Sequence, residues 1–166
     1  MLKRILCATL ASGALVLSGS AAAQELKIAL IAGKTGPLEA YAKDTEKGFM
    51  LGLEYLTNGT MALNGRKIRV IVKDDQLKPD LGKAMLAEAY ADDKVDIAVG
   101  TTSSGVALAM LPVAEEYKKV LIVEPAVADA ITGDKWNRYI FRTGRNSAQD
   151  GLASAATLKS GGSVAY

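Results

Sequence analysis

The sequence predicts an α/β protein built on a doubly wound parallel sheet, and two observations lead to that prediction. Short apolar runs of the length of strands alternate with longer segments whose apolar residues recur at helical spacing. Because a single helix separates most strands from the next, the connections should be right-handed crossovers, which produce parallel strands with helices on both faces.

The individual patterns assign a type to each element. The first is a continuous apolar run, and the second carries Tyr41, Phe49, Leu53 and Leu56 at helical spacing. The third alternates apolar with charged residues, as a strand does. In order, the predicted elements are strand 26–32, helix 40–56, strand 67–74, helix 79–93, strand 95–99, helix 104–117, strand 120–123, strand 139–142 and helix 148–158.

Turn residues and prolines separate these elements. The stretch "NGTMALNGR", residues 58–66, is predicted to be a turn-rich connection. Pro79 suits the first turn of a helix, and the acidic Asp80 beside it complements the helix dipole. Pro112 falls inside a predicted helix, where it removes one backbone hydrogen bond, so we expect a kink there.

The regular alternation breaks near residue 142, which predicts a domain boundary. We assign residues 24–141 to a first ligand-binding lobe and residues 142–166 to a hinge, including Arg142 and Thr143, and the start of a second lobe. The last residues, 163–166, begin an apolar strand. A domain rarely ends on an unpaired strand, because its edge would be exposed, so we expect a chain that is truncated.

The N-terminus predicts export. Lys3 and Arg4 precede an apolar run over 5–17 and small residues at 21–23, the pattern of a secretory signal peptide spanning residues 1–23. The apolar run is shorter than the about 20 residues of a membrane helix, so we expect no membrane insertion after the signal is removed. Cys7 stands at the beginning of the run, whereas a lipid-modified cysteine would follow it.

Charge and side-chain chemistry exclude several classes of function. The chain has 20 basic and 18 acidic residues, and loss of Lys3 and Arg4 with the signal peptide brings the two into balance. A neutral chain without basic clusters is a poor candidate for binding nucleic acid or anionic membranes. There is no histidine, and the only cysteine is Cys7. We therefore expect no catalytic residue of the Ser-His or Cys-His type, no metal site and no cofactor.

In a doubly wound sheet the ligand crevice lies beyond the carboxyl ends of the strands, so the loops there carry the candidate site. The loop after the first strand contains Gly33-Lys34-Thr35, the last three letters of a phosphate-binding loop. The first glycine of that motif would stand at Ile28, and Gly36-Pro37 interrupts the helix that should follow. A nucleotide site is therefore not expected.

The loop "GTTSSG", residues 100–105, places hydroxyls and backbone N–H groups at a predicted helix N-terminus. These donors and the helix dipole favour a carboxylate or similar anion. Ser103 and Ser104 have no lysine at helical spacing to activate them, so catalysis by either serine is not favoured. Two roles remain open for Ser104: capping the helix and contacting a ligand.

Asp74 and Asp75 end the second long strand. Two carboxylates at this position could hold magnesium, but a strand-terminating turn in which Asp75 bonds its own backbone before Pro79 is the favoured interpretation.

The chain resembles the exported binding proteins of branched-chain amino acid type ABC importers, over residues 24–166. The resemblance rests on an ordered series of segments: "GKTGPLEAYAKDTEKGFMLGLEYLTNG", "IRVIVKDDQLKPDLGKAMLAEAYADDKVDIAVGTTSSGVALAMLPVAEEYKKVLIVEPA" and "RYIFRTGRNSAQDG". It implies a type I periplasmic binding protein fold, in which two lobes close on a small ligand and deliver it to a membrane permease. This chain would contain the first lobe and the start of the second.

The resemblance also implies ligand-binding residues. Tyr41 matches a tyrosine that commonly borders the ligand, and Ser103 and Ser104 match a pair that holds the ligand carboxylate in amino-acid binders. Ala126 matches a position whose carbonyl accepts from the ligand ammonium. These roles agree with a crevice that offers neutral donors to an anion and carbonyls to a cation.

Two departures weaken the assignment to amino acids. Ala128 stands where these binders usually have a hydroxyl residue, and Glu124 stands where a serine or threonine commonly precedes Pro125. Glu124 could pair with a ligand amine or with Arg142, or it could be a solvated strand end. The ligand could thus be an amino acid, an aromatic acid or an amide.

The sequence therefore predicts a non-catalytic, periplasmic solute receptor of an ABC importer. A ligand-sensing receptor domain of the same fold is the alternative, and an exported enzyme is disfavoured because no base or metal site is evident.

Overall fold

A computed structural model describes residues 25–158. The predicted signal peptide and the strand predicted over 163–166 lie outside these residues. The strands are β1 (Leu26–Ala32), β2 (Ala62–Leu63), β3 (Arg66–Asp74), β4 (Ile97–Gly100), β5 (Val120–Val123) and β6 (Ile140–Arg142). The helices are α1 (Glu39–Leu56), α2 (Pro79–Ala91), α3 (Ser104–Tyr117) and α4 (Ser147–Leu158), with a 3₁₀ turn, η1, at Asp129–Ile131.

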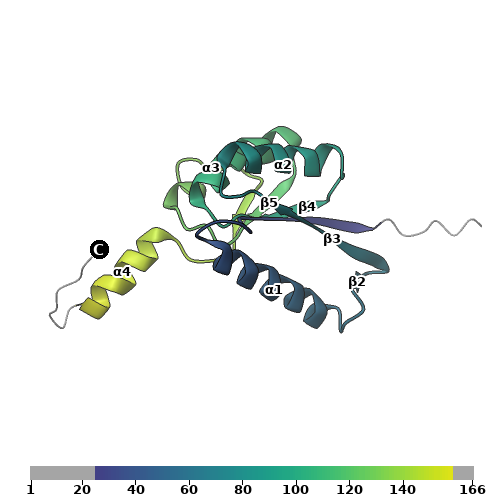
Figure 1. The fold of residues 1–166 in the computed structure, drawn as a ribbon, viewed down its shortest axis with the longest axis horizontal. Helices are drawn as coiled ribbons and strands as arrows, with labels where there is room; N and C mark the ends of the chain where they lie inside the picture. The colour runs from purple at the N-terminus through teal and green to yellow at the C-terminus, as the bar shows by residue number, and fades with distance from the viewer. Residues whose placement is uncertain (1–24, 159–166) are drawn as a thin grey trace, which may run out of the picture.

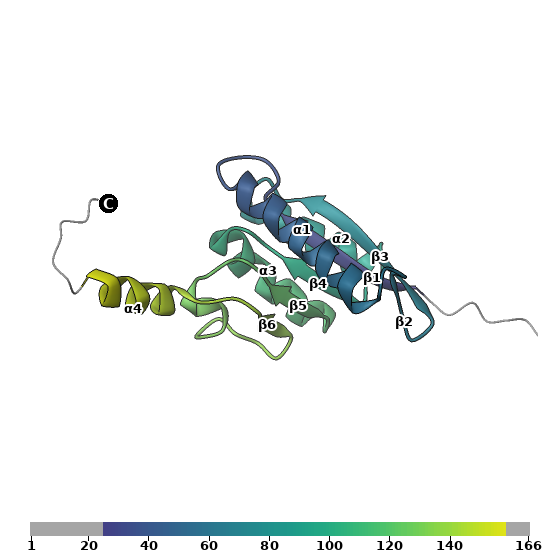
Figure 2. The ribbon, with the colours of Figure 1, turned by 90° about the horizontal axis from the view of Figure 1, so that it is seen from below.

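The strands form one sheet in the order β2-β3-β1-β4-β5-β6. β1 lies in the middle and pairs in parallel with β3 and β4, and β5 and β6 extend the parallel sheet on the β4 side. α2 and α3 cover one face of the sheet, and α1 lies on the other (Figures 1 and 2). The predicted doubly wound α/β fold is confirmed.

The predicted turn-rich connection over 58–66 is present, and it also contains the short strand β2, which was not predicted. β2 pairs with β3 in an antiparallel hairpin, in which Leu63 lies opposite Arg66. Asn64 and Gly65 have φ values of 50° and 79°, the backbone conformation of a type I′ turn, whose right-handed twist suits a two-residue hairpin. The Asn-Gly pair was the signal that could have predicted it.

Other boundaries differ by a few residues. β4 begins at Ile97 and not at Val95, because the Val95 N–H bonds the Ala89 carbonyl of α2 and not a neighbouring strand. α2 ends at Ala91 and not at residue 93, and the turn η1 was not predicted. α3 runs continuously through Pro112 to Tyr117.

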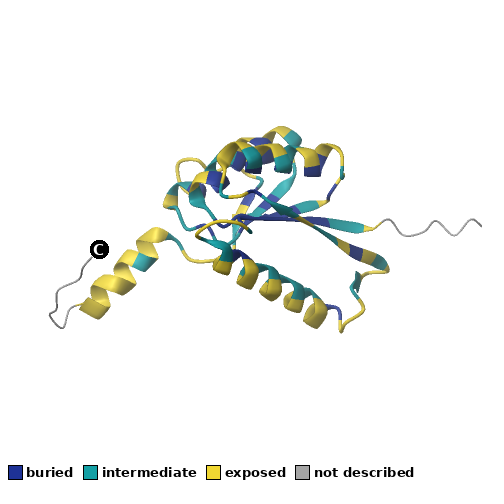
Figure 3. Cartoon of the chain, in the orientation of Figure 1, coloured by how far each residue is buried: buried dark blue, intermediate teal, exposed yellow. Residues whose placement is uncertain are grey.

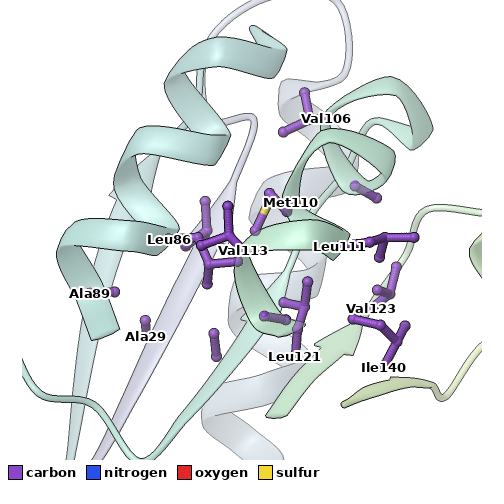
Figure 4. Close-up of a cluster of buried hydrophobic side chains, with 14 of the residues drawn as sticks. Ala29, Leu86, Ala89, Val106, Met110, Leu111, Val113, Leu121, Val123 and Ile140 are labelled. Carbon is purple, nitrogen blue, oxygen red and sulfur yellow. The ribbon is translucent and has the colours of Figure 1, made fainter. Parts of the chain in front are cut away.

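The main core lies between the sheet and the α2–α3 pair, and we call this side the packed face (Figure 4). Side chains of β1 alternate between the two faces, so that Ala29 and Ile31 join this core while Ile28 and Leu30 join the cluster under α1. Among the fully buried side chains of the packed face are Leu86, Met110, Leu111, Leu121, Val123 and Ile140.

Two glycines allow close approach at the crevice end. A Cβ on Gly82 of α2 would lie 2.3 Å from Val106 Cγ1 of α3, so the two helices meet over this glycine. Gly100, at the end of β4, has φ of 148°, and a Cβ there would lie 2.1 Å from the Ile31 carbonyl oxygen. Gly100 therefore requires glycine, whereas a side chain at position 82 would have to displace Val106.

α4 projects from the body of the molecule, and it has no buried residue (Figures 1 and 3). It follows β6 through residues 143–146, where the sequence predicts the hinge. No helix among residues 25–158 is both long and apolar enough to cross a membrane.

Candidate functional site

The carboxyl ends of the five parallel strands lie at one edge of the sheet, as the crossover topology requires. A pocket of about 210 Å³ lies at this edge. Three predicted site residues come together in it: Tyr41 from α1, Ser104 from α3 and Ala126 from the loop after β5. Its full lining is Leu38, Tyr41, Thr102, Ser104, Pro125, Ala126, Val127 and Arg145.

Three other predicted residues do not line this pocket. Ser103 precedes Ser104 at the start of α3, and Ala128 follows the wall residue Val127. Glu124 lines a separate groove of about 350 Å³ on the α1 side of the sheet. The ligand roles of all the predicted residues stay predictions.

Ser104 does not cap α3 through its side chain. Its Oγ instead accepts hydrogen bonds from the N–H groups of Val127 and Ala128, at 3.2 and 3.1 Å. The N-cap of α3 is Ser103, and its hydroxyl makes no capping bond. Because both acceptor positions of the Ser104 hydroxyl are occupied, its O–H is left to act as a donor.

The start of α3 adds further donors to this wall. The first N–H groups of a helix have no partner within the helix, and the dipole makes this end favourable for an anion. Thr102, just before α3, is buried, and its Oγ1 accepts from the Gly33 N–H at 3.1 Å. This bond ties the loop after β4 to the loop after β1.

The nucleotide interpretation stays rejected on structural grounds, because a carboxylate occupies the Gly-Lys-Thr loop. Asp74 Oδ1 accepts from the Lys34 N–H at 2.8 Å, and Asp74 Oδ2 accepts from the Thr35 hydroxyl at 3.1 Å. The Lys34 ammonium forms an ion pair with Glu46 at 2.9 Å. The donors that would hold a phosphate are thus engaged within the chain.

The turn interpretation of the two aspartates is confirmed. Asp75 Oδ1 accepts from the Leu77 N–H at 2.8 Å, and Asp74 Oδ1 accepts from the Gln76 N–H at 3.0 Å. Asp75 is fully buried and also accepts from the Thr101 hydroxyl. In residues 25–158 no cluster of acidic, histidine or cysteine side chains could hold a metal ion.

The pKa values of Asp74 and Asp75 shift in opposite directions. Burial raises the pKa of Asp75, although the hydrogen bonds from Thr101 and Leu77 act against the rise. The pKa of Asp74 is lowered, because donors on Gln76, Lys34 and Thr35 together outweigh its partial burial.

Of the three roles left open for Glu124, pairing with Arg142 is not the one that the structure shows. Glu124 Oε2 accepts from the Thr143 hydroxyl at 2.7 Å. Arg142 Nη1 donates to the carbonyl oxygen of Ala128 at 2.8 Å, and its Nη2 donates to the Thr132 hydroxyl. The guanidinium thus binds carbonyls of the loop after β5, those of Val127 and Ala128.

Sequence reasoning missed Arg145, which lines the pocket. Its Nε donates to Asp150 Oδ1 at 2.6 Å, and its side chain is 60% exposed. Arg145 follows the carboxyl end of β6, which belongs to the same crevice edge as the other strand ends. That placement was the signal that could have found it.

Comparison with known proteins identifies relatives along nearly the whole described chain. A family model described as periplasmic binding protein matches residues 25–166. A Leu/Ile/Val-binding protein homolog of Brucella melitensis is 28% identical over 155 residues, which are 93% of this chain and 41% of the relative. The chain thus spans about two fifths of the length of that relative.

Solved structures of similar proteins belong to the same class of transporter proteins. A crystal structure of an ABC-type branched-chain amino acid transporter from Rhodopseudomonas palustris is 76% identical, with a TM-score of 0.76 over 77% of this chain and 34% of that one. A solute-binding protein of an ABC transporter from another Rhodopseudomonas palustris strain, in complex with 3,4-dihydroxy benzoic acid, is 31% identical, with a TM-score of 0.72 over 83% of this chain and 37% of that one.

Proposed function

Since the chain belongs to the periplasmic binding protein family and is of the branched-chain amino acid ABC transporter type, we propose that it is the first lobe of an exported solute receptor. In this proposal the complete protein captures a small carboxylate between two lobes and delivers it to the membrane permease of an ABC importer. Closure of the lobes converts binding into a shape that the permease recognises.

One observation carries the proposal: residues from α1, from the start of α3 and from the loop after β5 line a single pocket. The Ser104 O–H and the N-terminus of α3 present donors to it. Such a wall suits a ligand carboxylate. We assign no catalytic step to it, because the chain has no histidine to activate a nucleophile.

Two ligand classes are supported by the relatives. The Brucella melitensis relative is named for leucine, isoleucine and valine, and a Rhodopseudomonas palustris neighbour holds a dihydroxybenzoic acid. Amino acids and aromatic acids share a carboxylate, and this shared group is what the pocket wall is proposed to bind. The place of action proposed for the complete protein is the periplasm.

The test is a ligand screen on the full-length protein, followed by substitution of Ser104. A thermal-shift screen of amino acids, aromatic acids and amides first identifies a ligand, because a ligand that binds the folded state raises the melting temperature. Ser104→Ala should then weaken binding of a carboxylate by about 1–3 kcal/mol in calorimetry, through the lost donor.

Ser154→Ala on α4 is the matched control, since Ser154 is exposed and does not line the pocket. Its affinity should stay close to that of the natural protein. Melting of the unliganded Ser104→Ala protein reports separately on the lost bonds to Val127 and Ala128. Equal affinity of Ser104→Ala and the natural protein for every carboxylate would remove Ser104 from the site.

A further inference from the structure

Asp75 is a buried carboxylate that lies outside the pocket. Its side chain is fully shielded from solvent, and it is not among the residues that line the pocket. Well-packed apolar side chains in place of a buried polar pair often leave a protein equally stable or more stable. Folding free energy alone therefore does not account for a carboxylate here, and its hydrogen bonds indicate another role.

Asp75 is firmly attached at the end of β3. Its N–H donates to the Ala32 carbonyl of β1 at 3.0 Å, and its carbonyl accepts from the Lys78 N–H at 2.9 Å. Its Oδ1 accepts from the Leu77 N–H at 2.8 Å. These bonds fix the backbone of Asp75 and one of its two carboxylate oxygens.

The second carboxylate oxygen bonds a different loop. Asp75 Oδ2 accepts from the hydroxyl of Thr101, which follows β4 and is fully buried as well. A hydrogen bond is electrostatically stronger in a buried site than in water, and it requires a donor that points at the acceptor. Asp75 therefore sets the direction in which the Thr101 side chain points.

Thr101 is bonded to one residue of the pocket wall and adjoins another. Its carbonyl accepts from the Ala126 N–H at 3.2 Å. The next residue, Thr102, accepts from the Gly33 N–H at 3.1 Å through its Oγ1. Ala126 and Thr102 both line the pocket. The loops after β1, β3, β4 and β5 thus meet at Thr101 and Thr102.

We propose that Asp75 is a positioning residue of the ligand pocket, which holds Ala126 and Thr102 in place through Thr101 without touching the ligand. The side chain and the carbonyl of Thr101 belong to one residue, so a backbone rotation that moves one also moves the other. When the bond to Asp75 is lost, Thr101 can turn, and both wall residues lose their fixed places. This role rests on the proposed solute-receptor function and deepens it.

Two matched substitutions separate positioning from a general loss of stability. Thr101→Val keeps the shape of the side chain and removes the hydroxyl that Asp75 binds. Thr57→Val is the control, because Thr57 is also buried and its hydroxyl donates to the Leu53 carbonyl at 2.7 Å. Thr57 follows the end of α1 and does not line the pocket. Both variants should melt at a lower temperature than the natural full-length protein, because each loses a buried hydrogen bond.

Hydrogen exchange of the ligand-free, full-length protein tests the position of the wall without a ligand. Thr101→Val should make the Ala126 amide exchange at least about 10-fold faster, because its acceptor is no longer held in place. Thr57→Val should leave that amide within about 2-fold of the natural rate. Thr101→Ser, which restores a hydroxyl for Asp75, should restore the slow exchange.

Calorimetry with L-leucine and benzoate tests the effect on binding, since both probes carry the carboxylate of the proposed ligand. Thr101→Val should weaken the binding of whichever probe the natural protein binds by about 5- to 50-fold. Thr57→Val should change it by less than about 2-fold, and Thr101→Ser should recover most of the natural affinity. A purely structural role would give the two valine variants the same affinity. When neither probe binds, the compound found in the ligand screen takes their place.

A double-mutant cycle assigns the effect to the bond between Asp75 and Thr101. Asp75→Ala should weaken the binding of the same probe by a similar factor to Thr101→Val. The variant that carries both should bind no more weakly than Asp75→Ala alone, because both substitutions remove the same hydrogen bond. Losses that multiply in the double variant would show that Asp75 acts by another route and would overturn the inference.

Failure of the inference and failure of the proposed function give different results. Natural affinity in Thr101→Val would overturn the positioning role and leave solute capture standing, as would equal losses in Thr101→Val and Thr57→Val. If the natural protein binds neither probe and no compound of the ligand screen, the proposed function loses its support. Exchange then decides the inference alone: an unchanged Ala126 amide in Thr101→Val would overturn it, and a faster one would support the hold of Asp75 on the wall.

Discussion

The two faces of the sheet are packed to different extents. On the packed face, α2 and α3 lie against each other and against β1, β4 and β5, and their side chains form a continuous buried core. On the other face, α1 lies alone over a smaller cluster around Ile28, Leu30 and Ile68, and only one of its own residues, Ala42, is buried. Figure 3 shows the exposed outer side of α1.

This difference indicates that the packed face supplies most of the stability of this lobe, while the α1 side leaves a groove and exposed apolar side chains. The packed face buries large aliphatic side chains completely, which is the main source of folding free energy. Beside α1 there is a groove lined by Phe49, Val99 and Ile122, and Val72 and Phe141 are exposed. Substitutions should therefore have unequal effects on the two faces.

The largest expected difference is between two leucines. Leu86→Ala empties a fully buried position of the packed face and should cost about 2–5 kcal/mol in the free energy of unfolding. Leu53→Ala on α1 removes a side chain that is only partly buried, so it should cost less than half as much. Urea unfolding of the two variants measures both. Equal losses would show that the faces are equally packed.

A smaller difference is expected between two glycines. Gly82→Ala places a methyl group against Val106 and should destabilise the protein by about 1–3 kcal/mol, since α2 and α3 must move apart. Gly48→Ala on α1 meets open space and should stabilise by about 0.5–1 kcal/mol, because alanine favours the helix. Thermal unfolding of the two variants measures whether each is less or more stable than the natural protein. Stabilisation by Gly82→Ala would contradict the close contact of α2 and α3.

The smallest expected effect is on the pH dependence of stability, and it concerns Asp74 and Asp75. Like the two faces of the sheet, these residues differ in how far they are buried. Asp75 is buried close to Gly82 on the packed face, and Asp74 binds the loop that leads to α1. The folded pKa of Asp74 is lowered, so its stabilisation is present above the unfolded pKa of about 3.9 and is lost as the pH falls through the folded value. Asp74→Asn should lower the free energy of unfolding by about 0.5 kcal/mol at neutral pH. The effect is small because solvent screens the interactions of a partly exposed carboxylate.

The contribution of Asp75 to stability depends on pH with the opposite sign. Its folded pKa is raised, so its contribution is present below the unfolded value and is lost as the pH rises through the folded value. Melting temperatures of Asp74→Asn and Asp75→Asn across pH 3 to 7 check both slopes. Asp74→Asn should reduce the loss of stability in acid, whereas Asp75→Asn should reduce the loss on raising the pH. The same slope for both variants would contradict the assignment.

Most of the fold could be predicted because its signals are local. The continuous apolar run of β1, the proline that opens α2 and the helical spacing of α1 each depend on neighbouring residues. β2 was missed because two residues are too few for a periodic pattern, and only the Asn64-Gly65 pair marked it.

The candidate site was less predictable, since its contacts join distant parts of the chain. Tyr41, Ser104 and Ala126 were named from the family resemblance, and they line one pocket because the strand order brings their loops together. Their ligand roles stay predictions. Nothing in the sequence showed that Arg142 would bind the Ala128 carbonyl and leave Glu124 to Thr143. Arg145 was overlooked because its side chain enters the pocket only through the path of the chain after β6.

The two backbone bonds to Ser104 have a consequence for the entropy of binding. A surface serine hydroxyl rotates among three staggered positions, and a ligand that bonds it must select one of them. The N–H groups of Val127 and Ala128 restrict that rotation already in the folded protein. The rotational freedom of this hydroxyl is therefore lost during folding, and a ligand that accepts from it meets a donor that is already aimed.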